Sequence, residues 1–307
     1  MNAATKVGFV GLGVMGFPMV ANLRKAGHDV SVYDVVEAVR DRSRNDGIDV
    51  AADLSSLIAT SDIVITMLPD TPDVDAVLHA AGGLLERGRA GQVYIDMSTI
   101  SPIATREFAS ELAEKGISMI DAPVSGGVQK AITGELSIMV GGEEETLNAV
   151  LPILTSMGNP THIGDAGAGQ ATKACNQVCV AIGIQAIAEA FALGSKLGLD
   201  LDRLYAALLS GSCNSFLLEN HGPLMLAGDD DPGFRVALQV KDLKIAKNAA
   251  LDTSTALPGA STVLDLYLDA IANGQATDGN QSLSRVYERI TGATIGKQPH
   301  HSAPAIS

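Results

Sequence analysis

The chain has 307 residues, of which 46% are hydrophobic and 18% are charged, a composition that supports two folded domains and excludes a disordered chain. Its 35 acidic residues outnumber the 21 basic ones and give a formal net charge of −14, which repels nucleic-acid phosphates and anionic lipid. We therefore expect no nucleic-acid partner and no membrane partner.

From residue 5 to about 164, short runs typical of strands alternate with helical patterns. The predicted strands are KVGFV (6–10), DVSVY (29–33), DIVITML (62–68), VYIDM (93–97), SMIDAP (118–123), SIMVGG (137–142) and THIG (161–164). The predicted helices between them are 15–26, 72–80, 102–115 and 143–156. This alternation is typical of βαβ units and predicts an α/β, Rossmann-type, doubly wound and mostly parallel sheet over residues 1–165.

After Gly169 the strand signals end and long apolar periodicities follow one another. The predicted helices are 170–197, 201–210, 214–226, 235–251, 258–272 and 280–290. We expect an all-helical domain for substrate binding and oligomerisation over residues 166–292, linked to the first domain by the long helix. The acidic segment 227–234 is predicted to be a solvated turn without a ligand, and residues 293–307 a flexible tail.

Cysteine usage and the N-terminal sequence favour a cytoplasmic protein. The three cysteines, Cys175, Cys179 and Cys213, are too few for a disulfide framework. The six histidines lack metal-binding spacing, so we expect no metal site. The start MNAATKVGFVGLG lacks the apolar stretch and cleavage site of a signal peptide.

The first predicted strand runs into a glycine-rich turn, GLGVMG, that opens a helix. Its glycines have the spacing GxGxxG, in which Gly11 permits the tight turn, Gly13 lets backbone amides approach a pyrophosphate, and Gly16 lets helix and strand pack closely. The motif alone is a weak signal, and the alternative is a structural turn with no ligand. The strand before it and the acid after the next strand favour a dinucleotide site.

That acid is Asp34, whose carboxylate accepts hydrogen bonds from ribose hydroxyls and repels a 2′-phosphate. The basic residues that follow, Arg40, Arg42 and Arg44, are predicted to face away from Asp34 on a helix. We therefore predict NAD as the cofactor, with NADP as the alternative.

Two further segments carry polar groups suited to a small acid. The turn in DAPVSGG (121–127) presents a hydroxyl and free amides that suit a carboxylate, although an ordinary βα connection explains it equally well. In GAGQATKACNQ (167–177), Lys173 and Asn176 project from one face of a helix, where a snorkelling surface lysine is the alternative.

Taken together, these stretches resemble the β-hydroxyacid dehydrogenase family over nearly the whole chain. Its members include 3-hydroxyisobutyrate dehydrogenase, 2-(hydroxymethyl)glutarate dehydrogenase and tartronate semialdehyde reductase. The matching motifs are GFVGLGVMGFPMVANL, ITMLP, DMSTISP, DAPVSGGVQKAITGELSIMVGG, GAGQATKACNQ and FRVALQVKDLKIA. The resemblance implies a Rossmann domain followed by a helical domain, and NAD(P)-dependent oxidoreduction of small 3-hydroxy acids or their semialdehydes, by a homodimer or homotetramer.

Carried over residue by residue, the resemblance makes Lys173 the catalytic proton donor and acceptor. Asn176, Ser125, Gly126 and Gly127 are implied to bind the substrate. The implied cofactor-binding residues are Gly11, Leu12, Gly13, Val14, Met15, Gly16, Asp34, Met67, Leu68, Pro69, Thr99 and Lys241. One position departs from the family, because Asp73 stands where some members carry an asparagine that touches the cofactor.

Three other functions fit the same motifs. An NADP-preferring semialdehyde reductase, of the tartronate, succinic or glyoxylate type, differs from the NAD-dependent dehydrogenase only in its nucleotide and in the direction of the reaction. A non-catalytic dinucleotide-sensing module and an imine reductase are disfavoured by Lys173, because neither function requires a lysine there. Two segments, SGSCNSFLLENHGPLMLAGD and SRVYERITG, favour the 2-(hydroxymethyl)glutarate type.

Overall fold

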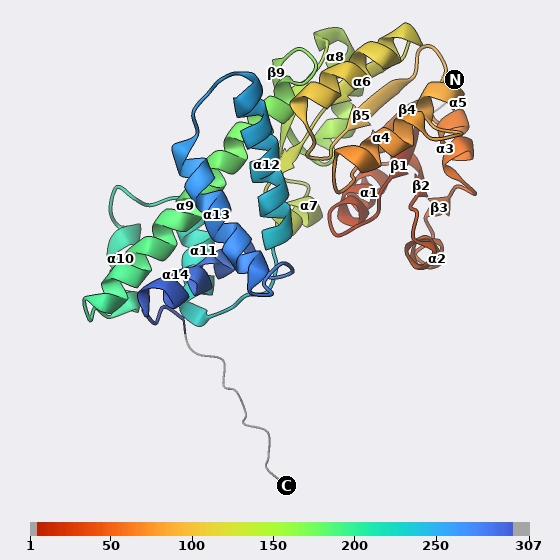
Figure 1. Ribbon diagram of the computed structural model, residues 1–307. Helices are drawn as coiled ribbons and strands as arrows, with labels where there is room; N and C mark the ends of the chain where they lie inside the picture. Colours follow the sequence, from red (N-terminus) through yellow and green to blue (C-terminus); the bar gives the residue numbers. More distant parts are fainter. Residues whose placement is uncertain (1–4, 297–307) are drawn as a thin grey trace. The chain divides into compact units, whose positions relative to one another are not determined.

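A computed structural model describes residues 5–296, which form two compact units that divide between Cys175 and Asn176. Among the described residues, every named strand lies in the first unit, and the second unit is built from helices (Figure 1). The predicted order of an α/β domain followed by a helical domain is confirmed. The units divide inside the long helix, whereas the prediction placed the boundary after residue 165.

A nine-stranded sheet forms the centre of the first unit. Its strands are β1 (Lys6–Val10), β2 (Asp29–Tyr33), β3 (Asp49–Val50), β4 (Ile63–Thr66), β5 (Val93–Asp96), β6 (Ser118–Asp121), β7 (Val124–Ser125), β8 (Leu136–Gly141) and β9 (Gly158–Gly164). The strand order is β3-β2-β1-β4-β5-β6-β8-β7, with β9 paired to β8. The strands from β3 through β2, β1, β4 and β5 to β6 run parallel, whereas β8 is antiparallel to β6 and β7. The prediction of a mostly parallel sheet is confirmed.

Helices cover both faces of this sheet. They are α1 (Gly16–Lys25), α2 (Glu37–Asn45), α3 (Leu54–Thr60), α4 (Thr71–His79), α5 (Leu84–Arg87), α6 (Pro102–Glu114), α7 (Gly127–Thr133) and α8 (Glu144–Thr155). Successive strand residues point to opposite faces, so Ile63 and Ile65 pack with α1, α7 and α8, while Val64 packs with α3 to α6. Continuous apolar strands are therefore buried on both sides, as a doubly wound sheet requires.

The elements that the sequence patterns did not reveal lack an apolar period. Helix α2 buries only Ser43 and is stabilised by ion pairs from Glu37 to Arg40 and Arg44. Helix α3 has seven residues and begins at a capping box formed by Asp53 and Ser56. Strand β3 has two residues, too few for a recognisable alternation.

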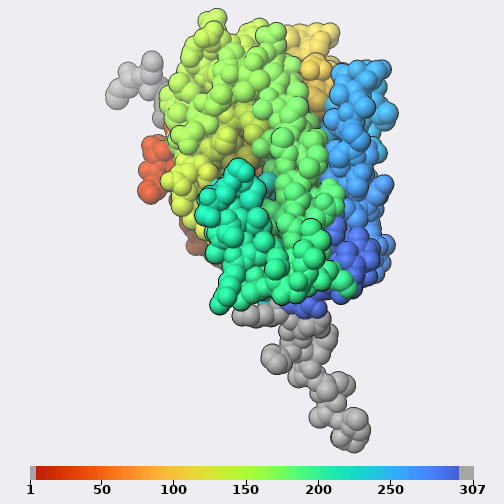
Figure 2. Space-filling model, turned by 90° about the vertical axis from the view of Figure 1, so that its left-hand side faces the viewer, coloured from red at the N-terminus to blue at the C-terminus, as the bar shows by residue number. Residues whose placement is uncertain are grey.

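The second unit packs helices around one apolar core. They are α9 (Ala168–Lys196), which enters it from the first unit, and α10 (Leu201–Leu209), α11 (Phe216–Ala227), α12 (Val236–Asp252), α13 (Pro258–Ala272) and α14 (Leu283–Thr291), with a short 3₁₀ turn at Asn280–Ser282. The core includes Phe191 and Tyr267, and Ala293 and Ile295 are buried in it. Helix α10 lies on the surface, where none of its residues is buried (Figure 2).

The predicted tail begins inside this core, because Ala293 and Ile295 belong to it. The rest of the tail, residues 297–307, lies outside the described part of the chain. Helix α9 is also the one helix among residues 5–296 that is long and apolar enough to cross a membrane, a test that core helices pass as well.

Candidate active site

The glycine-rich turn follows β1 and ends at the start of α1. Gly11 has a φ of 98°, and a side chain there would overlap the backbone carbonyl of Met67. A Cβ at Gly16 would overlap the carbonyl of Gly11, so this glycine lets helix and strand pack closely. Gly13 differs, because a Cβ there would meet no atom within 4 Å. The fold does not require a glycine at this position, whereas a pyrophosphate close to the backbone does.

The rest of the turn separates into buried and exposed residues. Leu12 is buried, and Met15 packs against the apolar core formed with α1, α7 and α8, while Val14 is 68% exposed. The N-terminus of α1 has no side-chain cap, because its N-cap residue is Met15. Uncapped backbone N–H groups at a helix N-terminus favour an anion. This geometry fits a dinucleotide pyrophosphate.

Asp34 directly follows β2 and is oriented by the glycine-rich turn. Its Oδ2 accepts a hydrogen bond from the backbone N–H of Leu12 at 2.7 Å, and its Oδ1 accepts one from Val36 at 2.9 Å. A carboxylate fixed between the turn and the second strand is the group that binds ribose hydroxyls in dinucleotide-binding folds.

The prediction that the arginines of α2 face away from Asp34 is wrong for Arg40. Its guanidinium donates to the backbone carbonyl of Asp34 and to the carboxylate of Glu37, and it lies 5.4 Å from the centre of the Tyr33 ring. The hydrogen bond from Arg40 lowers the pKa of Glu37. The backbone carbonyl of Asp34 and the Tyr33 ring hold Arg40 beside Asp34, and helical spacing alone does not reveal these contacts.

The other two arginines of α2 are engaged elsewhere. The guanidinium of Arg42 lies 4.2 Å from the centre of the Phe17 ring, and Arg44 forms an ion pair with Asp41 at 2.6 Å. A cation–π contact and an exposed ion pair both leave the side chain at the surface.

Loops that follow β4 and β5 carry Met67, Leu68, Pro69 and Thr99. The backbone N–H of Leu68 donates to Ser98 Oγ at 2.9 Å, which ties the two loops together. Asp73 accepts a hydrogen bond from the backbone N–H of Asp70 and completes a capping box at the start of α4. The residue that departs from the family pattern therefore has a structural role here.

The segment 125–127 joins a strand to a helix. Ser125 ends β7, where it pairs with Ser137 of β8. Gly126 and Gly127 have φ values of 131° and 68°, which disfavour any residue with a side chain. Since Gly126 is the N-cap of α7 and has no capping side chain, the backbone N–H groups that follow have no side-chain acceptor from that position.

Lys173 and Asn176 lie on α9, as the sequence predicted. Lys173 is 6% exposed, so it is not a surface lysine of the snorkelling kind. The Oδ1 atom of Asn176 is buried and has no hydrogen-bond partner among the described residues. A buried acceptor without a partner costs free energy unless a ligand group satisfies it.

Residues of the second unit that the sequence reasoning missed are Gln177 and Asp242. The Nε2 of Gln177 donates to Asp242 Oδ2 at 2.6 Å, and Lys241 forms an ion pair with Asp242 Oδ1 at 3.0 Å. Both Gln177 and Asp242 are buried. The sequence spacing could have indicated Gln177, because it follows Lys173 by four residues and lies on the same face of the helix.

Two buried carboxyl groups end adjacent strands of the first unit. Burial raises the pKa of Asp96 to about 6, although hydrogen bonds from Ser98 and Thr66 act in the opposite direction. Burial likewise raises the pKa of Asp121, opposed by backbone hydrogen bonds from Gly167 and Gln170. Carboxyl groups this deeply buried at the carboxyl ends of parallel strands lie where ligands bind in such sheets.

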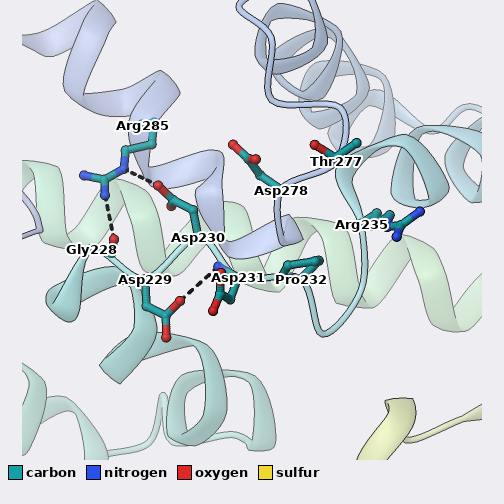
Figure 3. Close-up of a pocket in the computed structure, with 9 residues that line it drawn as sticks. All are labelled: Gly228, Asp229, Asp230, Asp231, Pro232, Arg235, Thr277, Asp278 and Arg285. Carbon is teal, nitrogen blue, oxygen red and sulfur yellow. Dashed lines mark hydrogen bonds and ion pairs between the residues drawn. The ribbon is translucent and has the colours of Figure 1, made fainter. Parts of the chain in front are cut away.

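A cavity of about 650 Å³ lies in the second unit, at the acidic turn (Figure 3). Its lining residues are Gly228, Asp229, Asp230, Asp231, Pro232, Arg235, Thr277, Asp278 and Arg285. Arg285 forms an ion pair with Asp230 at 3.1 Å, and burial raises the pKa of that carboxyl. None of the predicted site residues lines this cavity. Among residues 5–296, no group of three or more His, Cys, Asp or Glu side chains is arranged to hold a metal ion.

Two protein-family profiles match the chain. Residues 6–180 match the NAD-binding domain of 6-phosphogluconate dehydrogenase, and residues 167–287 match the NAD-binding domain of NADP-dependent 3-hydroxyisobutyrate dehydrogenase. The profiles meet in α9 and together cover both units.

Individual relatives agree with the profiles. The chain is 39% identical to 2-hydroxy-3-oxopropionate reductase of Escherichia coli over 92% of this chain and 97% of the relative. It is 35% identical to 2-(hydroxymethyl)glutarate dehydrogenase of Eubacterium barkeri over 96% of this chain and 99% of the relative. The solved structure of Mycobacterium tuberculosis 3-hydroxyisobutyrate dehydrogenase with L-serine superposes with a TM-score of 0.85 at 35% identity, covering 94% of this chain and 99% of that one.

Proposed function

Because the chain belongs to the β-hydroxyacid dehydrogenase family of NAD(P)-dependent oxidoreductases, we propose that it interconverts a small 3-hydroxy carboxylic acid and its semialdehyde, with NAD as the cofactor and Lys173 as the proton donor and acceptor. The observation that carries this proposal is the burial of Lys173, since a buried lysine near the start of α9 has no role in solubility and suits proton transfer.

The proton-transfer step belongs to Lys173. When bound, the nicotinamide supplies or accepts the hydride at its C4 atom. In oxidation, Lys173 Nζ takes the proton of the substrate hydroxyl as the carbinol C–H bond breaks; in reduction, it returns that proton to the aldehyde oxygen. In the direction of reduction, the ammonium group of a lysine is the acid that the aldehyde oxygen requires.

The remaining predicted residues bind and orient the substrate. The hydroxyl of Ser125 and the backbone N–H groups at the start of α7 suit a carboxylate, which accepts several hydrogen bonds. The unsatisfied Oδ1 of Asn176 accepts the hydrogen bond of a hydroxyl or of an ammonium group. Holding the acid group at one end leaves the carbinol carbon free to face the nicotinamide.

A panel of substrates tests this proposal. We expect 3-hydroxyisobutyrate, 2-(hydroxymethyl)glutarate or another 3-hydroxy acid, and not 2-hydroxy acids or simple alcohols, to be oxidised. Absorbance at 340 nm should rise faster with NAD, which forms NADH, than with NADP, which forms NADPH. Faster reduction of a semialdehyde with NADPH than with NADH supports the semialdehyde reductase instead. Tight nucleotide binding without turnover of any acid or aldehyde supports the dinucleotide sensor and contradicts the proposal.

Asp34→Asn tests the choice of nucleotide. Removing the charge weakens the hydrogen bonds to the ribose hydroxyls and relieves the repulsion of a 2′-phosphate, so we expect the ratio of kcat/KM for NAD to that for NADP to fall about tenfold. Asn keeps an acceptor for only one of the two backbone N–H groups, those of Leu12 and Val36, that Asp34 binds, so thermal unfolding of the variant is measured beside its kinetics. Asp41→Asn is the control, because it removes an equal charge from the exposed face of α2. An unchanged ratio in Asp34→Asn contradicts this reading of Asp34.

A further inference from the structure

The first turn of α9 carries a buried glutamine, Gln170, that binds the loop after β5. Gln170 is 1% exposed. Its Oε1 accepts a hydrogen bond from the backbone N–H of Ile100 at 3.1 Å, and its Nε2 donates to the carbonyl of Ser98 at 2.7 Å. The Nε2 also approaches Asp96 Oδ2 at 3.4 Å. One side chain therefore binds the backbone on both sides of Thr99.

The same loop is joined to the loop after β4. Ser98 Oγ accepts the hydrogen bond from the backbone N–H of Leu68, and Asp96 Oδ1 accepts hydrogen bonds from Ser98 N–H at 3.1 Å and Thr66 Oγ1 at 2.8 Å. Leu68 and Thr99 are two of the residues expected to line the cofactor. Both are thereby connected through hydrogen bonds to Gln170.

A second buried group, Asp121, fixes the backbone of the same helical turn. Its Oδ1 accepts from the N–H of Gly167 at 2.7 Å and its Oδ2 from the N–H of Gln170 at 2.8 Å. It acts as the N-cap that Gly167 has no side chain to provide. A Cβ at Gly169 would overlap the carbonyl of Met139 and lie 2.8 Å from Asp121 Oδ2, so a glycine lets the helix approach the sheet closely.

Lys173 follows Gln170 by three residues on this helix. Three residues advance the helix by about 4.5 Å and return nearly to the same face. Any shift of the first turn therefore moves the lysine. Since a displacement of about 1 Å in a reacting group reduces turnover by as much as about 100-fold, such a shift has a kinetic consequence.

We infer that Gln170, with Asp121, is a positioning residue that sets the distance between Lys173 and the cofactor-lining loops at Leu68 and Thr99. This inference rests on the proposed role of Lys173. It assigns the Gly-Ala-Gly-Gln segment (167–170) to helix placement: the glycines permit the approach, Asp121 holds the backbone, and the glutamine links the helix to the loops.

Gln170→Met tests the inference, because methionine has a similar volume and none of the hydrogen bonds. We expect kcat to fall about tenfold while KM for NAD stays within about twofold, and the isotope effect with substrate deuterated at the carbinol carbon to rise. Gln92→Met is the matched control. Gln92 is similarly buried in the first unit and also makes three hydrogen bonds, all of them to backbone groups. Its Nε2 donates to the carbonyls of Ile58 and Ser61, and its Oε1 accepts from the N–H of Arg89.

Gln92 precedes β5, at the opposite end of that strand from Asp96, so its variant should lose stability without losing turnover. The inference is overturned if Gln170→Met keeps its kcat, or if both variants lose kcat in proportion to their loss of thermal stability. If Gln170→Met does not fold, Asp121→Asn is measured in the same way, because its amide nitrogen cannot accept one of the two backbone hydrogen bonds. Full turnover in Lys173→Ala instead contradicts the proposed function itself, which separates the two failures.

Discussion

Lys173→Ala is expected to lower kcat by about 10²- to 10⁴-fold, the usual contribution of a general acid or base, while the dissociation constant for NAD changes little. The reason is that Lys173 is buried on α9, whereas the pyrophosphate and ribose sites are predicted at the turn after β1 and at Asp34. The measurement is steady-state turnover of the best 3-hydroxy acid together with a nucleotide titration of the same variant.

Two companion variants separate proton transfer from charge and from helix stability. Lys173→Arg keeps a positive charge but cannot give up its proton near neutral pH, so it should lose oxidation about as severely as Lys173→Ala. Lys196→Ala removes an exposed lysine from the other end of α9 and should retain full turnover. Added primary amines should partly restore turnover in Lys173→Ala. Turnover that survives in Lys173→Arg would assign the residue an electrostatic role in place of proton transfer.

The parts of the fold that the sequence predicted are those with a strong local signal. The apolar strand 6–10, the alternating strand 29–33, the glycine-rich turn between them and the long apolar helix α9 each carry a pattern that the final packing reinforces. The charged helix α2 and the two-residue strand β3 carry no such pattern. Ion pairs stabilise the helix and hydrogen bonds to β2 form the strand, and neither depends on a run of buried apolar residues.

The candidate site was predictable where backbone geometry demands a residue type and unpredictable where distant side chains meet. Gly11 is favoured by its positive φ and Gly16 by its contact with the carbonyl of Gly11, both within one local turn, so their spacing after a strand indicated them. The contact of Asp121 with the first turn of α9 spans 46 residues to Gly167, and its partner is a backbone group that any residue provides. No spacing rule relates such a pair. Gln170 remained unassigned for the same reason.

Gly13→Ala is expected to weaken NAD binding by about 10- to 100-fold without lowering thermal stability. The added methyl group meets no atom of the protein within 4 Å, so it occupies the space in which the pyrophosphate would approach the backbone. Overpacking a closely fitted contact costs about 1–3 kcal/mol, which corresponds to this loss of affinity. The free protein should be as stable as the wild type or slightly more so, because alanine restricts the unfolded chain.

Two other glycines make the interpretation specific. Gly233, like Gly13, has open space around its would-be Cβ, and it lies in the second unit; Gly233→Ala should leave both nucleotide affinity and stability unchanged. Gly16→Ala places its methyl group against the carbonyl of Gly11 and should lower the melting temperature of the nucleotide-free protein. Calorimetric titration with NAD and thermal unfolding without nucleotide distinguish the three variants. Unchanged NAD affinity in Gly13→Ala would show that the turn after β1 is structural only, since a pyrophosphate bound against that backbone has no room for the extra carbon.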